Sequence, residues 1–359
     1  MRRLKYFFII TIPAFLVGIV FLELVFRFVI PASNIPYYYY DPEQQVLRFD
    51  VDKSRTGTYT MGNLAQQRAR WHVNNFGWNS DIDYVSEMRI KPLIAVIGDS
   101  YVEALHVDAD ENVASLLREK IGDDFDVYSF GVSGAPISGY LQMSRYVNEH
   151  FNPDVLVFNV VHNDFDESLC KVSTAPGLMC LQISEDKVTE AEIIAYVPNQ
   201  VKRLSRKSSL VRYVFLNLKV QRRLGRAQKG NQDQDNNTLA AVSTDPQTDR
   251  IERATDYVLQ KIASENAGKT VIFMIDGPRT EIYEGNIEGS KNLWMNRLLE
   301  GQTGSYGFHF IDLTESFAEE FARNSNKFEN RYDYHWNENG HAVASEALLK
   351  MLRQIGAVE

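Results

Sequence analysis

Residues 92–100 read PLIAVIGDS, and this stretch decides the fold. The five consecutive apolar residues at 93–97 are typical of a β-strand that is buried on both faces. The triplet GDS at 98–100 then ends the run with small and polar residues. We therefore expect a central strand of a parallel sheet here, with Ser100 at its carboxyl end.

The same alternation of strand and helix continues along the chain. Further apolar runs predict strands at 125–130, 155–161, 271–275 and 308–311, and helical periodicity predicts helices near 110–121, 137–150, 249–266, 291–300 and 338–352. Alternating strands and helices are typical of an α/β sandwich with a mainly parallel sheet. The first of these helices has Asp110 as its expected cap.

The N-terminal stretch differs from everything that follows it. Residues 6–22 carry no charge, and the apolar run continues to Ile30, interrupted only by Glu23 and Arg27. As a helix these 25 residues would extend about 37 Å, enough to cross a bilayer. Basic residues among the first five predict a cytoplasmic N-terminus, with the rest of the chain periplasmic or extracellular. A cleaved signal peptide is the alternative, although no clear A-x-A site follows.

The sequence divides into three parts on this basis. Residues 1–31 are the expected single-pass membrane anchor, 32–90 a juxtamembrane segment with short strands, and 91–359 the α/β domain. Two segments of that domain do not follow its alternation of strands and helices. Residues 165–198 read as an insertion, and the polar stretch 225–248 as a mobile loop.

The insertion holds the only two cysteines of the chain. Cys170 and Cys180 stand ten residues apart, around a proline and a glycine. Outside the cytoplasm they could close a small loop as a disulfide. The alternative is two unrelated buried thiols. Two cysteines alone cannot build a four-thiolate zinc site.

Composition and charge exclude several classes of protein. The 359 residues are 44% hydrophobic with a net charge of −9, which excludes a disordered chain and disfavours nucleic-acid binding. One segment is locally basic, since 202–229 carries ten Lys or Arg and no acid. Its apolar residues could share one helical face, from Leu204 through Val211 to Leu218. It reads either as an amphipathic helix on an anionic membrane or as a solvated basic face.

Small and polar residues follow three of the predicted strands, where ligands bind in open α/β sheets. Ser100 follows the first, Gly134 the second and Asn163 the third. A glycine lets its backbone amide approach a substrate closely. The Ser100 N–H, the Gly134 N–H and the Asn163 side-chain amide could together form an oxyanion hole.

A serine nucleophile needs a general base, and only seven histidines are present. His335 lies in the loop just before the last helix, whereas His341 falls inside that helix and is expected to face packing. Asp333 is the nearest carboxylate that could orient His335. A metal site on Asp333, His335 and His341 is the competing interpretation.

The four blocks GDS at 98–100, Gly134, Asn163-Asp164 and Asp333-x-His335 resemble, in order, those of the SGNH (GDSL) hydrolase family. The resemblance covers about residues 92–355. It implies a flavodoxin-like three-layer α/β/α sandwich and serine acyl-transfer chemistry without a cofactor. It also implies the roles given above to these residues.

Two departures from the family pattern concern the last two blocks. Val161 stands where the family usually has glycine, which would tighten the pocket beside Asn163. Asp333 stands two residues before His335 rather than three, and Tyr332 occupies the position where the family often has its aspartate.

The anchor and the D-x-H-W-N pattern look like those of membrane-tethered cell-envelope members of this family. The expected function is extracytoplasmic hydrolysis of an O-acyl ester, most simply O-acetyl, on an envelope or exported polysaccharide. Acyl transfer to a sugar hydroxyl is the alternative, because water and sugar resolve the same acyl-enzyme. A catalytically silent scaffold in an envelope polysaccharide assembly is the alternative from a non-enzymatic class of function. The expected partners are an acylated glycan and the membrane, and not nucleic acid.

Overall fold

The computed structural model describes residues 7–87, 89–185, 187–200, 203, 206–218, 220 and 246–358. Most of the predicted loop 225–248 and much of the basic segment therefore lie outside the described residues. The chain divides into two compact units, so that the stretch 32–90 is shared between them. The anchor unit consists of Met1–Ile35, Gly57–Ala69 and Pro198–Gln234, and the sheet unit of Pro36–Thr56, Arg70–Val197 and Asp235–Glu359.

A five-stranded parallel sheet forms the centre of the sheet unit. Its order is β6-β5-β7-β10-β11, which in chain order is 2-1-3-4-5, an order common in doubly wound sheets. The strands are β5 (Leu93–Gly98), β6 (Asp126–Gly131), β7 (Val155–Val160), β10 (Thr270–Ile275) and β11 (His309–Asp312). The predicted mainly parallel sheet is confirmed.

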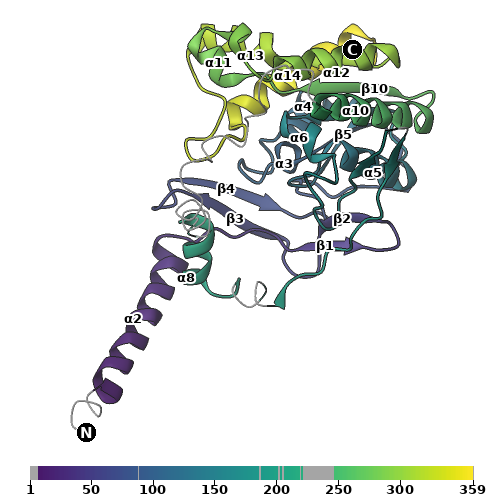
Figure 1. Ribbon diagram of the computed structural model, residues 1–359. Coiled ribbons are helices and arrows are strands. Elements are labelled where there is room, and N and C mark those ends of the chain that lie inside the picture. Colours follow the sequence, from purple (N-terminus) through teal and green to yellow (C-terminus); the bar gives the residue numbers. More distant parts are fainter. Residues whose placement is uncertain are drawn as a thin grey trace. The chain divides into compact units, whose positions relative to one another are not determined.

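Helices cover both faces of this sheet, because each strand sends alternate side chains into two separate cores (Figure 1). In β5, Leu93, Ala95 and Ile97 enter one core, and Ile94 and Val96 enter the other. The first core is closed by α5 (Ile137–Phe151), α10 (Pro246–Glu265) and α12 (Leu293–Ser305). The second is closed by α4 (Val113–Ile121), α11 (Arg279–Glu284), α13 (Leu313–Asn324) and α14 (Glu338–Gln354).

Several element boundaries differ from the sequence prediction. Helix α4 begins at Val113, because Asn112 rather than Asp110 caps it by accepting from the amides of Ala114 and Ser115. The prediction missed α11 and α13, as well as two short helices that directly follow strands. These are α3 (Ser100–Glu103) after β5 and α6 (Asn163–Glu167) after β7.

Short hairpins and turns complete the sheet unit. Cys170 and Cys180 are joined in a disulfide within the predicted insertion. The small antiparallel pairs are β1 (Tyr38–Asp41) with β2 (Val46–Phe49), and β8 (Leu181–Ile183) with β9 (Val188–Glu190). The 3₁₀ turns of this unit span Gly122–Asp124 and Ile287–Gly289. A further pair, β3 (Thr56–Met61) with β4 (Gln67–His72), lies mostly in the anchor unit.

The anchor unit contains the apolar N-terminal helix. Among the described residues, the 23-residue stretch Phe7–Val29 is the one helix apolar and long enough to cross a membrane, with a mean hydropathy of 2.6 over an 18-residue window. An anchor and a signal sequence both meet this description. It consists of α2 (Ile12–Leu24) between the π-helical turns Phe7–Thr11 and Val25–Val29.

Glu23 near the end of this helix organises the described part of the basic segment. Its carboxylate pairs with Arg27 at 2.8 Å and accepts from the amides of Ser209 and Leu210 at 2.9 Å. It thereby caps α8 (Ser209–Arg212), which continues as the π-helical turn Tyr213–Asn217.

The buried face of this basic helix differs from the expected apolar one. Ser209, Tyr213 and Asn217 are buried, and Val211 is only half-buried. Asn217 accepts from the amide of Ser33, so hydrogen bonding as well as apolar contact selects that face.

Candidate active site

Ser100 lies directly beyond β5, at the first position of α3. The side chain of Asp99 caps this short helix by accepting from the amide of Tyr101 at 2.9 Å. Gly98 leaves the space that the turn needs, because a Cβ there would lie 2.5 Å from a methyl group of Val102. The strand therefore delivers the Ser100 hydroxyl to the sheet edge in a fixed orientation.

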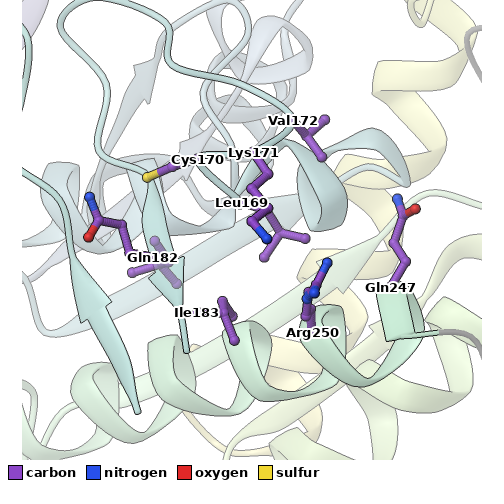
Figure 2. A pocket seen from close by; sticks show the side chains of 9 residues that line it. Leu169, Cys170, Lys171, Val172, Gln182, Ile183, Gln247 and Arg250 are labelled. Atoms are coloured by element: carbon purple, nitrogen blue, oxygen red, sulfur yellow. The ribbon is translucent and has the colours of Figure 1, made fainter. Parts of the chain in front are cut away.

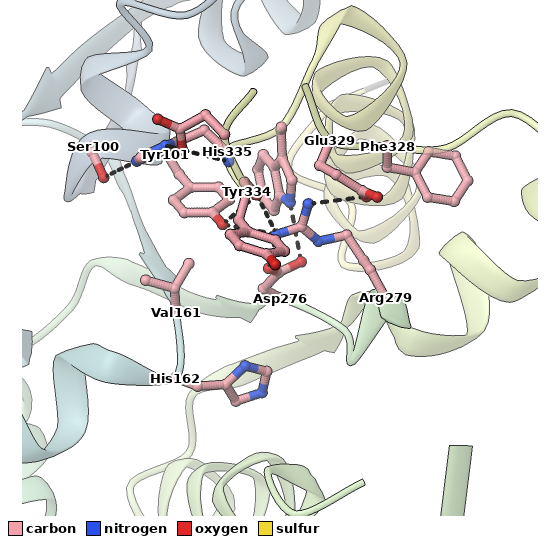
Figure 3. Close-up of polar contacts among 12 residues, drawn as sticks. Ser100, Tyr101, Val161, His162, Asp276, Arg279, Phe328, Glu329, Tyr334 and His335 are labelled. Atoms are coloured by element: carbon pink, nitrogen blue, oxygen red, sulfur yellow. Dashed lines mark hydrogen bonds and ion pairs between the residues drawn. The ribbon is translucent and has the colours of Figure 1, made fainter. Parts of the chain in front are cut away.

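The structure brings Ser100 against His335, which stands 235 positions later in the sequence (Figure 3). Asp333 contacts the other ring nitrogen of His335. His335 Nε2 lies 2.7 Å from Ser100 Oγ, and His335 Nδ1 lies 2.5 Å from Asp333 Oδ1. A carboxylate at Nδ1 fixes the proton there and leaves the Nε2 lone pair to accept the serine proton. Ser100 Oγ also lies 3.1 Å from Asp99 Oδ2, but a hydroxyl has one proton and the contact with His335 is the shorter.

A second imidazole lies against this arrangement. The ring of His106 stacks on that of His335, with centroids 3.8 Å apart and planes 11° apart. His106 Nε2 also lies 3.9 Å from Asp333 Oδ2, so both histidines face one carboxylate. The sequence analysis gave His106 no role.

The structure changes the set of residues that could together hold a metal ion. Ligand atoms of His106, Asp333 and His335 lie within 4.8 Å of one another, whereas His341 is buried inside α14. The edge of the Trp336 ring packs on His341, and burial lowers the pKa of this imidazole to about 3, with repulsion from His335 as a further cause. His341 is thus a neutral packing residue.

The expected oxyanion donors follow neighbouring strands. Gly134 lies in the turn after β6 with φ +76°, and a Cβ placed there meets no atom within 4 Å. The glycine is therefore required by its backbone conformation, and its surroundings are open. Asn163 begins α6, and its Nδ2 donates to Glu167 Oε2 at 3.2 Å. Because an amide nitrogen carries two protons, one remains for a substrate oxygen.

A buried arginine holds the loop that carries His335. The Arg279 guanidinium donates to Tyr101 Oη at 2.8 Å and to the carbonyl of Tyr334 at 2.7 Å. It also pairs with Asp276 at 3.1 Å and with Glu329 at 3.5 Å (Figure 3). Burial alone would lower the Arg279 pKa, but the two carboxylates more than offset this, and the pKa is raised.

The loop is held on the other side of His335 as well. The Trp336 indole donates to Asp276 Oδ1 at 3.0 Å, and Tyr101 Oη donates to the Tyr334 carbonyl at 2.9 Å. Both chain neighbours of His335 are therefore tied to one network that starts at the end of β10. Asp276 and Arg279 carry no motif in the sequence, and no periodicity marks them.

Other described residues line a cavity that lies away from the candidate active site. Its volume is about 500 Å³, and it lies between the disulfide insertion and the start of α10 (Figure 2). Leu169, Lys171, Ile183 and Arg250 are among its lining, which includes none of Ser100, Gly134, Asn163 and His335.

A family model identifies the class to which this arrangement belongs. The model of the GDSL-like lipase/acylhydrolase family matches residues 96–343, and the chain therefore belongs to that family. Membership of this family supports hydrolase activity for the chain and gives no support to acyl transfer. No curated protein sequence matches the chain.

The solved structures that are similar to this chain include two esterases and a lipase/acylhydrolase. The aryl esterase of M. smegmatis is 11% identical with TM-score 0.39, covering 73% of this chain and 99% of its own. The lipase/acylhydrolase of Enterococcus faecalis is 11% identical with TM-score 0.40, covering 75% and 97%. The carbohydrate esterase family 2 enzyme of Corynascus thermopiles is 14% identical with TM-score 0.38, covering 77% and 70%.

Proposed function

We propose that this protein is a membrane-anchored, extracytoplasmic serine esterase that cleaves an O-acyl ester by way of an acyl-enzyme on Ser100. The observation that carries the proposal is the continuous contact from Asp333 Oδ1 through His335 to Ser100 Oγ, with distances of 2.5 and 2.7 Å. The 2.7 Å contact between His335 and Ser100 lies in the range over which a base takes a proton from a nucleophile, and the contact with Asp333 orients that base.

Each group has one task in the first half of the reaction. Ser100 Oγ attacks the ester carbonyl carbon while its proton passes to His335 Nε2. Asp333 stabilises the imidazolium that forms and itself stays ionised. The ester C–O bond then breaks, and His335 gives its proton to the departing alkoxide.

Water completes the cycle through the same base. It attacks the acyl carbon and passes a proton to His335, after which Ser100 leaves and regains that proton. In both halves the negative oxygen faces the Ser100 and Gly134 amides and the Asn163 side chain. Loss of one such donor typically costs about 3–4 kcal/mol of transition-state stabilisation.

Location and substrate are the further parts of the proposal. The apolar Phe7–Val29 helix supports a tethered protein, and the disulfide between Cys170 and Cys180 supports an oxidising compartment. The O-acetyl group of an envelope or exported glycan is the substrate that suits that location. Acetate release from such a glycan, compared with butyrate and octanoate esters, tests this choice.

The central experiment labels the full-length protein in detergent with a fluorophosphonate probe and maps the adduct by mass spectrometry. We expect an adduct on Ser100, with labelling and ester turnover lost in Ser100→Ala and His335→Ala. Far-UV circular dichroism controls for folding. A folded wild-type protein that neither labels nor turns over ester would refute the esterase and favour the scaffold alternative.

A further inference from the structure

The nucleophile helix ends in a buried acid to which the mechanism above gives no role. Glu103 stands one turn after Ser100 in α3, and it is 2% exposed. Acidic side chains are almost never buried so fully unless they are paired. Among the residues that the structure describes, the hydrogen-bond partners of this carboxylate are uncharged donors.

These donors come from two other segments of the chain. Tyr38 of β1 gives its hydroxyl to Glu103 Oε1. Ser133 gives its hydroxyl to Oε2 and its backbone amide, at 3.3 Å, to Oε1. Ser133 directly precedes Gly134, so the carboxylate fixes the turn that presents this proposed oxyanion donor.

The backbone adds a steric constraint at the same place. A Cβ on Gly131 would lie 1.9 Å from the backbone nitrogen of Glu103, so β6 packs directly on α3. On the far side of the turn, Gly134 faces open space. The turn is thus fastened to the nucleophile helix on one side and open on the other, where a substrate oxygen must bind.

Tyr38 is itself held firmly in the sheet unit. Its ring packs on Phe49 of the same hairpin with centroids 4.9 Å apart, and on Tyr196 at 6.2 Å. The hairpin that follows the anchor unit in the chain therefore reaches the support of the active site.

We propose that Glu103 is a positioning residue for the oxyanion hole, which holds the Ser133–Gly134 turn in register with Ser100 and is itself held by Tyr38. This inference rests on the proposed esterase function. The carboxylate acts on the transition state through the Gly134 amide, and it does not touch the substrate.

The surroundings of Glu103 shift the pKa of its carboxyl group. Burial raises its pKa to about 7, while the Ser133 and Tyr38 hydrogen bonds lower it and the nearby Asp99 carboxylate raises it. Glutamine keeps one acceptor oxygen for Tyr38 and the Ser133 amide, and its NH₂ can donate to the Ser133 hydroxyl oxygen. Glu103→Gln is therefore the conservative variant, and Glu103→Leu is the disruptive one.

The test uses the full-length protein in detergent with p-nitrophenyl acetate as substrate and phenylboronic acid as probe. Ser100 Oγ adds to boron as its proton passes to His335, and a boronate oxygen then occupies the oxyanion hole. For Glu103→Leu we expect kcat to fall at least thirtyfold with KM within threefold. The boronate Kd should rise by the factor by which kcat/KM falls, and Glu103→Gln should stay within threefold of wild type.

Milder variants keep the test decisive if Glu103→Leu fails to fold. Tyr38→Phe and Ser133→Ala each remove one hydroxyl, and each should lower kcat and boronate affinity threefold to tenfold. Tyr84→Phe is the matched control, because its buried hydroxyl bonds Ser129 in β6 and not the turn. It should leave kcat unchanged.

Two failures are distinguishable. If the wild-type protein does not hydrolyse ester or label at Ser100, the proposed function itself is wrong. If the wild-type protein is active and the folded Glu103, Tyr38 and Ser133 variants keep kcat and boronate affinity within twofold, only the positioning role is wrong. A purely structural role would lower the thermal midpoint and leave both of these quantities unchanged.

Discussion

Replacement of Arg279 by methionine should damage both stability and catalysis. The side chain of Arg279 is 10% exposed, and those of its partners Asp276 and Glu329 are 5% and 17% exposed. Methionine fills similar space but leaves the buried Asp276 and the partly buried Glu329 without their cation. Removal of one partner from such a pair typically costs about 3–5 kcal/mol, which for a chain of 359 residues lowers the thermal midpoint by about 4–7 °C.

The catalytic effect follows from where the guanidinium bonds. It holds the Tyr334 carbonyl and the Tyr101 hydroxyl, and so fixes the residue before His335 against the residue after Ser100. A shift of about 1 Å in a catalytic group can cost about a hundredfold in rate. We expect Arg279→Met to lower kcat by this order, with KM changed much less.

Differential scanning fluorimetry and ester hydrolysis on the full-length protein provide the two measurements. Arg297→Met is the matched control, because the 2.9 Å pair of Arg297 with Glu288 is exposed and worth at most about 1 kcal/mol. Arg279→Lys should recover little, since one ammonium cannot reproduce the planar fork. An Arg279→Met protein with kcat within twofold and a midpoint within 2 °C of wild type would refute the reasoning.

Three further outcomes are expected. Asp333→Asn should lower kcat by roughly 10⁴, as in other serine triads, while the protein stays folded by circular dichroism; wild-type turnover would remove Asp333 from the mechanism. The neutral buried His341 stabilises the fold above pH 6.5, and this contribution is lost as pH falls toward its folded pKa of about 3. Between pH 7 and pH 5 the loss is about 2 kcal/mol, so urea unfolding of His341→Gln should show a flatter pH dependence than wild type. Reduction of the Cys170–Cys180 disulfide, which closes a loop with a sequence separation of 10, should cost about 3 kcal/mol and lower the thermal midpoint. An unchanged midpoint in dithiothreitol, with both thiols alkylated, would contradict that estimate.

Local signals explain which elements were predictable. The run of apolar residues at 93–97 and the GDS triplet at 98–100 both belong to one segment, so the strand, the turn and the proposed nucleophile can be predicted together. The histidine was found by elimination, and its placement before the last helix matches α14. The missed α11 and α13 are short amphipathic helices, and each begins within four residues of a strand end. Their apolar residues therefore follow those of the strand so closely that the sequence shows no separate helical pattern.

The supports of the site were invisible because they depend on contacts between distant segments. His335 meets Ser100 across 235 positions, and Arg279 meets Tyr101 across 178. Nothing in the sequence of residues 101–106 shows that His106 will stack on His335. Only the fold brings that ring to the carboxylate of Asp333.

The order of the strands explains how one loop can serve this site. β5 delivers Ser100, and its two neighbours β6 and β7 lead to Gly134 and Asn163. β10 lies one strand further on, and at its end Asp276 and Arg279 hold both neighbours of His335. Because Asp276 directly follows β10 and Arg279 begins α11, the proposed general base is positioned from the end of this strand rather than by the helix that follows it. Catalysis should therefore be more sensitive to the end of β10 than to substitutions within α14.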